Sequence, residues 1–500
     1  MTRQLTGSTS TWDRVMRAFA KRISRRMLRK LPSSCDCSNM TLFGNKVIVS
    51  SVLLTLALAA SVPAQTVTND DTILKQIIIF GRHSVRAPTM SEADYAQYSP
   101  RPYPDFEVLQ PGYLTVHGQQ AEVLLGAYYR SYLLSEGLLT GDGSSDLAHS
   151  YFRANSIQRS NLTATMLGSG LFNGITVPVH SYALGQPDPV FDPVLANVAI
   201  VDAVRAANEV QGIYYSGTAL ASAYSAEFSL IRSVLFNYQN GVQPPPPAPP
   251  NITDPTTEPI PLDAVTTLLY TGNAVDEGGL AATNNAADPF VMAYADGLPL
   301  TDVGWGQLSL DTLSQTTRIT VLTQDIELRT PYLAQVQSSN AAAHILRSMR
   351  QAVLGEVIPG AFGDATSRVI AVISSDAYVT GLAGLIGLHW QLPGYQPDFC
   401  APGGALVFEL RQSTRSGEYL VRAFYTAQSF DQLRNLTPLT LTAPPETIQL
   451  LIPGGSRPGA PFDVSFEVFQ KLLRNAIGQR YVQDPALEVP PGVLASVPGQ

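Results

Sequence analysis

Three short apolar stretches along the chain each end in polar residues and are each followed by a helix-like stretch. The first, residues 73–80, is interrupted by only two polar residues and stops at Gly81, a pattern typical of a strand buried on both faces of a sheet. The second lies within residues 149–154, and the third is residues 368–373. Ligands bind outside the carboxyl ends of parallel strands, so we expect the polar residues after all three stretches to meet at one sheet edge.

Helical periodicity fills much of the remaining chain. It occurs in residues 119–134, 163–171, 200–210, 222–236, 311–324, 333–353, 377–388 and 462–477. Asn155 or Ser156 is expected to cap the helix after the second strand. Residues 187–193 are turn-rich and mark a domain boundary, whereas the prolines of residues 243–250 predict a stiff extended loop of polyproline type.

These patterns predict an α/β protein with a mainly helical cap inserted into it. The expected division is an N-terminal extension with a signal peptide (1–64), a first α/β part (65–195), a helical cap (196–315) with a Pro-rich loop (243–261), a second α/β part (316–484) and a frayed tail (485–500). No period of 20 to 50 residues repeats, which argues against a solenoid.

The amino-terminal part has the layout of an export signal. Lys46 precedes the apolar residues 47–60, and small residues follow up to Ala64, after which we expect cleavage. The apolar run is too short to favour a membrane span, so the mature protein is expected in the periplasm or outside the cell without stable membrane insertion. An uncleaved signal anchor is the alternative. Met40 would start a signal of ordinary length, and we expect translation to begin there.

The charge distribution and the cysteine content argue against nucleic-acid binding and against an intramolecular disulfide in the mature chain. Residues 1–64 hold 10 of the 32 Lys and Arg residues and 2 of the 40 Asp and Glu residues, which leaves 22 against 38, a net charge of −16, for residues 65–500. Such an acidic body argues against nucleic-acid binding. Cys35 and Cys37 fall in the segment to be removed, so Cys400 is left alone and is expected to be a buried small hydrophobic residue.

The most informative polar residues follow the first strand. Arg82, His83 and Arg86 come within five residues. Arginine guanidinium groups match phosphate oxygens and stay charged, and a neutral imidazole beside them can attack phosphorus. The alternative is an ordinary surface loop with two arginines, which the preceding strand makes less attractive.

Residues 82–88 read Arg-His-Ser-Val-Arg-Ala-Pro and resemble the R-H-G-x-R-x-P signature of the histidine acid phosphatases, the family of phytases and glucose-1-phosphatases. The resemblance implies a phosphoglycerate-mutase-like α/β sandwich with an inserted cap. It also implies that His83 is the nucleophile, that Arg82 and Arg86 clamp the phosphate, and that Thr89 contributes to the same site. Ser84 stands where the family has glycine.

Further segments carry the resemblance along residues 74–410. Leu114–Gly118 is similar to the family's L-T-x-x-G, and residues 402–409 are similar to its P-P-G-G-x-L-V-F-E. The family's third phosphate-binding arginine corresponds to Arg159, with Arg153 as a competing candidate that we expect in a structural salt bridge instead.

The family's His-Asp pair at the end of a strand corresponds to Ser375-Asp376. The resemblance makes Asp376 the proton donor to the leaving alcohol and places Ser375 in the phosphate site, where it replaces a histidine only partly. Glu227 is a further candidate that could reach the cleft from the cap, although a solvated helix-face carboxylate is the more ordinary interpretation.

The implied function is a secreted acid phosphatase that hydrolyses small-molecule phosphate monoesters through a phosphohistidine, with no metal or cofactor. The rival hypothesis is a secreted pseudo-phosphatase that binds phosphate esters with little turnover because Ser375 replaces the histidine. A mutase of the wider superfamily fits less well with export. The segment after residue 64 contains only two lysines, Lys75 and Lys471, which favours a broad or sugar-monophosphate specificity over a highly phosphorylated substrate.

Overall fold

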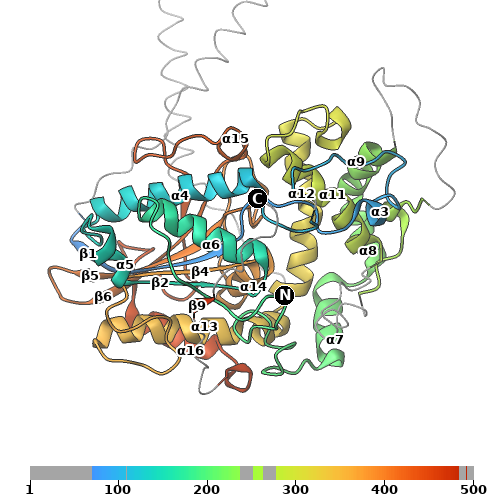
Figure 1. The fold of residues 1–500 in the computed structure, drawn as a ribbon. Coiled ribbons are helices and arrows are strands. Elements are labelled where there is room, and N and C mark those ends of the chain that lie inside the picture. The colour runs from blue at the N-terminus through green and yellow to red at the C-terminus, as the bar shows by residue number, and fades with distance from the viewer. Residues whose placement is uncertain (1–69, 109, 237–251, 263–277, 484–490, 493–500) are drawn as a thin grey trace, which may run out of the picture. The chain divides into compact units, whose positions relative to one another are not determined.

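The computed structural model describes residues 70–108, 110–236, 252–262, 278–483 and 491–492 (Figure 1). The predicted signal peptide, the start at Met40 and the polyproline stretch 243–250 lie outside these residues. The same is true of most of the predicted tail, 485–500.

A mixed sheet forms the centre of the unit that begins at Asp71. Its strands are β1 (Thr72–Arg82), β2 (Ser150–Ala154), β3 (Val179–His180), β4 (Val369–Ser374), β5 (Ala405–Ser413), β6 (Tyr419–Ala427), β7 (Glu446–Leu450), β8 (Val464–Ser465) and β9 (Pro491–Gly492). The order is β7-β6-β5-β1-β4-β2-β3-β9, and β8 pairs with β6. The pairing of β9 with β3 corrects the expectation of a wholly frayed tail, because backbone groups at 491–492 extend the sheet edge.

The first apolar stretch forms β1 and is buried on both faces, as predicted. Ile77 and Ile79 belong to one core cluster, and Ile78 and Phe80 belong to the other. This alternation follows from the two-residue period of a strand. β1 is parallel to β4 on one side, and β4 is parallel to β2, whereas β5 runs antiparallel to β1 on its other side.

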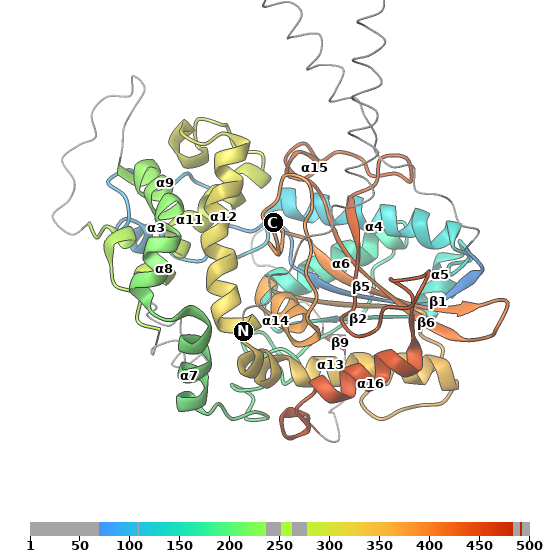
Figure 2. The ribbon, with the colours of Figure 1, turned by 180° about the vertical axis from the view of Figure 1, so that it is seen from behind.

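Helices cover both faces of the sheet. The helices are α3 (Glu92–Tyr95), α4 (Val116–Ser135), α5 (Gly143–Ala148), α6 (Gln158–Leu171), α7 (Ala203–Tyr214), α8 (Gly217–Ala223), α9 (Ser225–Phe236), α11 (Gly279–Ala295), α12 (Leu310–Gln324), α13 (Pro331–Leu354), α14 (Asp376–Ile386), α15 (Phe430–Arg434) and α16 (Phe466–Ala476). A π-helical turn, Asp325–Arg329, follows α12 directly. α4 and α6 lie on one face of the sheet, and α13 and α16 lie on the other (Figures 1 and 2).

The helices α7, α8, α9, α11 and α12 gather beside the sheet (Figures 1 and 2). They are the main part of the chain between β3 and β4, so the α/β fold with a helical insertion is confirmed. The domain boundaries given above stay a prediction, because residues 71–500 form a single compact unit. Within the described ranges, none of the helices combines the length and the apolar character needed to cross a bilayer.

Candidate active site

Three strand ends meet at one edge of the sheet. Arg82, the last residue of β1, lies opposite Ser374 of β4, and Ala154 of β2 lies opposite Ile373. The backbone N–H of His83 then donates to Ser374 O at 2.8 Å. The parallel register therefore brings the three polar segments together, as the strand pattern predicted.

His83 is a buried imidazole, 1% exposed, that is held by its own loop. Its Nδ1 lies 2.8 Å from the backbone oxygen of Ser84, so Nδ1 carries the hydrogen and Nε2 keeps a free lone pair. Burial, and then the positive charges of Arg159, Arg82 and Arg86, lower the pKa of His83 well below its usual value. The ring is therefore neutral, which is the form that can act as a nucleophile.

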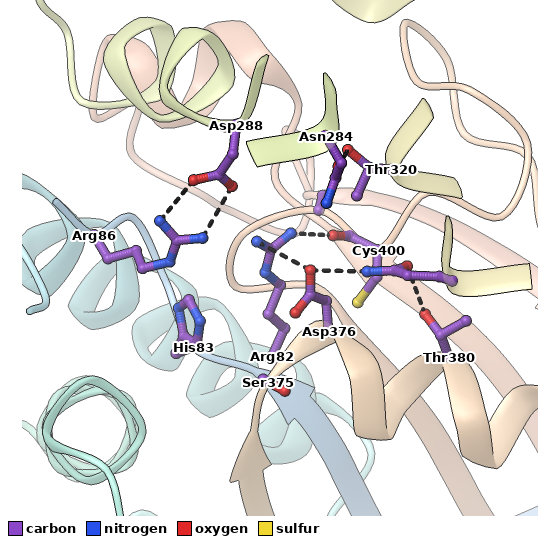
Figure 3. A network of polar contacts seen from close by, with 12 residues as sticks. Arg82, His83, Arg86, Asn284, Asp288, Thr320, Ser375, Asp376, Thr380 and Cys400 are labelled. Atoms are coloured by element: carbon purple, nitrogen blue, oxygen red, sulfur yellow. Dashed lines mark hydrogen bonds and ion pairs between the residues drawn. The ribbon is translucent and has the colours of Figure 1, made fainter. Parts of the chain in front are cut away.

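Arg82 joins the strand end to the next polar segment. Its Nη1 donates to the backbone oxygen of Cys400, and its Nη2 lies 3.3 Å from Asp376 Oδ2 (Figure 3). Cys400 itself is 1% exposed, and burial raises the pKa of its thiol to about 12, so it is the inert buried residue that the sequence predicted.

Arg86 pairs with a carboxylate from the helical insertion. Asp288 on α11 accepts two hydrogen bonds of 2.9 Å from the two terminal nitrogens of Arg86 (Figure 3). Burial opposes the charge of Arg86, but Asp288 outweighs this effect and raises the pKa of the arginine. No sequence pattern had singled out Asp288, which lies 202 positions from its partner.

Arg159 is the third guanidinium near the imidazole. It lies in the first turn of α6, and its Nη1 donates to the backbone oxygen of Gly112 at 3.3 Å. Burial and the charge of Arg86 lower its pKa to about 10, which still leaves it charged at neutral pH. The Nε groups of Arg82, Arg86 and Arg159 are all buried without a hydrogen-bond partner among the described residues. Three guanidinium groups thus lie close to one neutral imidazole, and this local excess of positive charge favours an anion.

Asp376 and Ser375 begin the helix after β4. Asp376 Oδ2 accepts a hydrogen bond of 2.9 Å from Gln324 Nε2 in addition to its contact with Arg82. Burial would raise the pKa of Asp376, but Arg82 and the two other site arginines outweigh it and lower that pKa. Ser375 is the N-terminal cap residue of α14, and its side chain makes no capping hydrogen bond there.

Thr89 and Glu227 are the two remaining predicted site residues. Thr89 is exposed and follows Arg86 by three residues in the same loop. Glu227 on α9 is buried and pairs with Arg318 at 3.0 Å. Contacts of these two side chains with a substrate stay predictions.

The salt bridge expected for Arg153 is present. Its Nη2 lies 2.7 and 2.8 Å from the two oxygens of Asp188, which is fully buried. Arg153 is therefore a structural residue, and Arg159 is the arginine of this segment near the imidazole.

The predicted cap of α6 was wrong. The cap residue is Ile157, which supplies no side-chain hydrogen bond, rather than Asn155 or Ser156. The side-chain oxygen of Asn155 instead accepts the backbone N–H of Ser156 at 2.6 Å, within the turn before the helix. The amino end of α6 is thus left without a side-chain acceptor beside Arg159, which suits an anion.

Comparisons with known proteins agree with this architecture. No protein-family model matches the chain. The chain is 24% identical to phytase AppA of Escherichia coli over 81% of its own length and 92% of that protein. It is 26% identical to a glucose-1-phosphatase of Salmonella typhimurium, over 79% and 91% of the two chains. The structure of Hafnia alvei phytase in complex with tartrate is similar, with a TM-score of 0.72, 26% identity and coverage of 83% of this chain and all of that chain.

The comparisons therefore confirm the resemblance to the histidine acid phosphatase family. The members that the chain matches are phosphoric monoester hydrolases. The likeness extends over most of both chains, so it includes the sheet and the helical insertion.

Ser84, which stands where the family has glycine, lies near a buried glutamate that sequence reasoning missed. Glu122 on α4 is 1% exposed, and burial raises its pKa to about 8, although the Ser84 hydroxyl acts in the opposite direction. Glu122 Oε1 has no hydrogen-bond partner in the described part of the chain. A carboxyl group that is neutral at physiological pH therefore lies behind the loop that carries His83.

A glycine explains how α4 reaches this loop. A Cβ on Gly118 would lie 2.3 Å from the backbone oxygen of Val85, so only glycine permits the close approach. Gly118 is the glycine of the L-T-x-x-G segment, and Thr115 of the same segment caps α4 by accepting the N–H of Gly118. The segment therefore fixes the helix against the loop that carries His83.

Metal binding has no support in these side chains. Over the ranges that the structure covers, no group of three or more His, Cys, Asp or Glu side chains is arranged to hold an ion. The prediction of a reaction without a metal or cofactor stays a prediction.

Proposed function

We propose that this protein hydrolyses phosphate monoesters through a phosphohistidine formed on His83. The observation that carries the proposal is a neutral, buried imidazole surrounded by three guanidinium groups whose Nε donors have no partner among the described residues. A carboxylate that can serve as an acid lies beside one of these guanidiniums. Positioning and charge stabilisation of this kind are the main means of catalysing phosphoryl transfer.

In the first step the lone pair on His83 Nε2 forms the N–P bond while the ester P–O bond breaks. Asp376, in its protonated form, transfers its proton to the departing alkoxide oxygen, and Arg82, Arg86 and Arg159 stabilise the charge on the phosphoryl oxygens. In the second step the Asp376 carboxylate takes a proton from water, whose oxygen attacks phosphorus and releases His83. Phosphate leaves, and the enzyme returns to its initial state.

The low pKa of Asp376 fits an enzyme that works at acidic pH. Without a ligand the arginines keep the carboxylate ionised. A bound phosphate monoester is an anion that offsets those charges, so the Asp376 pKa rises in the complex and the carboxyl can hold the proton that it must donate. Activity should therefore fall as the pH rises above the pKa of Asp376 in the complex.

The helical insertion favours substrates with one phosphate. The sequence between residues 196 and 324 contains three basic residues, Arg205, Arg232 and Arg318. Each of them is ion-paired with a carboxylate. The pocket next to Arg82 is lined instead by threonines and apolar side chains from α11 and α12, together with Asp288 and Phe399. We therefore propose a monophosphate of a neutral alcohol or sugar as substrate.

The test is an assay of the purified chain with an aryl phosphate and with glucose 1-phosphate at mildly acidic pH. Wild-type protein should turn over, His83→Ala should not, and a rapid quench with labelled substrate should recover acid-labile, base-stable phosphate on the wild-type protein alone. A chain that binds phosphate without turnover would instead support the pseudo-phosphatase hypothesis that rests on Ser375. Export is proposed as well, and the mature protein should then begin at Gln65, which amino-terminal sequencing can check.

A further inference from the structure

Two side chains outside the phosphate cluster form a hydrogen-bonded chain that ends on Asp376. Gln324 is the last residue of α12, and Thr380 lies one helical turn after Asp376 on α14. Gln324 Nε2 lies 2.9 Å from Asp376 Oδ2, and Thr380 Oγ1 lies 3.1 Å from Gln324 Oε1 (Figure 3). Thr380 is 1% exposed and Gln324 is 8% exposed.

The direction of this chain follows from the chemistry of its members. An ionised carboxylate can only accept hydrogen bonds, so the Gln324 amide must present its NH₂ group to Asp376. Its carbonyl oxygen then faces Thr380, whose hydroxyl can donate. The Asp376 carboxylate therefore sets the orientation of the Gln324 amide. Thr380 satisfies the amide carbonyl oxygen, and Gln324 holds one oxygen of Asp376.

Oδ2 of Asp376 thus receives two donors, Gln324 Nε2 at 2.9 Å and Arg82 Nη2 at 3.3 Å. A proton on Oδ2 would point at one of these donors, whereas neither of them contacts Oδ1. The backbone N–H of Ala377 also hydrogen-bonds to the carboxylate. We propose that Gln324 and Thr380 are positioning residues that direct the transferable proton to Oδ1 of Asp376. This inference rests on the proposed function, because it assumes that Asp376 is the acid.

The position of Gln324 links the acid to the helical insertion. The helix that ends at Gln324 also presents Thr316, Thr317 and Thr320 to the pocket beside Arg82. A π-helical turn, Asp325–Arg329, follows without a break, and such turns are frequent at functional sites. The helix that lines the small pocket beside Arg82 therefore also contacts the proposed acid.

Leaving-group dependence tests the inference. Gln324→Leu removes the donor, and we expect kcat/KM for an alkyl phosphate such as glycerol phosphate, whose leaving group needs a proton, to fall about 10- to 100-fold. With 2,4-dinitrophenyl phosphate, whose leaving group departs as an anion, kcat/KM, which reports only the first step, should change less than about threefold. Loss of the Oδ2 donor should also move the basic limb of the kcat profile upward by about one pH unit, because the ionised carboxylate loses a stabilising contact.

Thr380→Val should show the same leaving-group dependence in weaker form, because the Gln324 side chain loses the hydrogen bond to its carbonyl oxygen and its amide group can rotate. Thr323→Val is the matched control: Thr323 is buried on α12 next to Gln324, but its hydroxyl bonds only to Ile319 O of its own helix. In the background of Asp376→Asn, Gln324→Leu should cause no further loss with the alkyl phosphate.

Equal losses with both substrates, or an additive loss in Asp376→Asn, would overturn the inference and make Gln324 a structural residue only. Failure of the proposed function would look different, because the wild-type chain would then turn over neither substrate.

Discussion

Replacement of Glu122 by glutamine should change how the stability of the protein depends on pH. Glu122 is buried behind the loop of His83, and burial raises its pKa to about 8. In the unfolded chain the same carboxyl titrates near its ordinary value of 4.5. The folded protein therefore holds a proton on Glu122 over a range of pH in which the unfolded chain has lost it.

The sign and the size of the change in the free energy of unfolding with pH follow from this difference in pKa. Between pH 4.5 and 8 the folded state binds more protons than the unfolded state, so the free energy of unfolding falls as the pH rises. One pKa unit corresponds to about 1.4 kcal/mol, and this group alone therefore lowers stability by up to ~3 kcal/mol at pH 7 relative to pH 4.5. The neutral amide of Glu122→Gln does not ionise, and the variant should lose this contribution to the pH dependence.

Urea unfolding at several values between pH 5 and 8 measures the effect. The free energy of unfolding of the wild type should fall relative to that of Glu122→Gln by up to ~1.4 kcal/mol per pH unit. The variant should therefore become more stable relative to the wild type as the pH rises. Glu467→Gln, which replaces an exposed glutamate on α16, is the control and should run parallel to the wild type. Parallel curves for Glu122→Gln and wild type would refute the argument, because they would mean that Glu122 ionises as readily in the fold as outside it.

Three further substitutions test the site and its support. Asp376→Asn should lower kcat for an alkyl phosphate by about 100-fold or more, whereas Ser375→Ala should cost far less, since only the former removes the proton donor; equal effects in a steady-state assay would count against the assigned roles. Asp188→Asn leaves a buried arginine on β2 without its counter-charge and should destabilise the fold by about 3–5 kcal/mol in urea unfolding, and an unchanged midpoint would contradict this. Gly118→Ala adds a Cβ that would lie 2.3 Å from Val85 O, so it should reduce both stability and phosphatase activity, and a variant with wild-type melting and kcat would show that α4 can move away at no cost.

Much of the fold and part of the candidate site could be predicted because their signals are local. The burial of β1 on both faces follows from its apolar residues 77–80, and the polar residues after each strand mark the edge where the strands meet. Arg82, His83 and Arg86 lie within five positions of one another, so their chemistry can be read directly from the chain. Their catalytic roles still await the experiments above.

The partners of these residues could not be predicted, because they come from helices packed against the site from elsewhere in the sequence. Asp288 is 202 positions from Arg86, and Gln324 is 52 positions from Asp376. Each of these two residues lies in a helix whose hydrophobic pattern indicates only which face is buried. The pattern does not show which of the polar residues on that face has a partner in the site. The prediction of the α6 cap failed for a related reason, because the side-chain oxygen of Asn155 already accepts a hydrogen bond from the Ser156 N–H in its own turn.

The sequence by itself therefore determined the strands and the order in which their polar ends occur, and it predicted the residues that we propose bind and attack a phosphate. The tertiary structure alone decided which carboxylate holds which guanidinium, which oxygen of Asp376 is occupied, and that Glu122 is buried beside Ser84. The physical reason is that strand and motif signals depend on neighbours in the chain, whereas hydrogen-bond partners and the pKa of a buried group depend on which distant surfaces pack together.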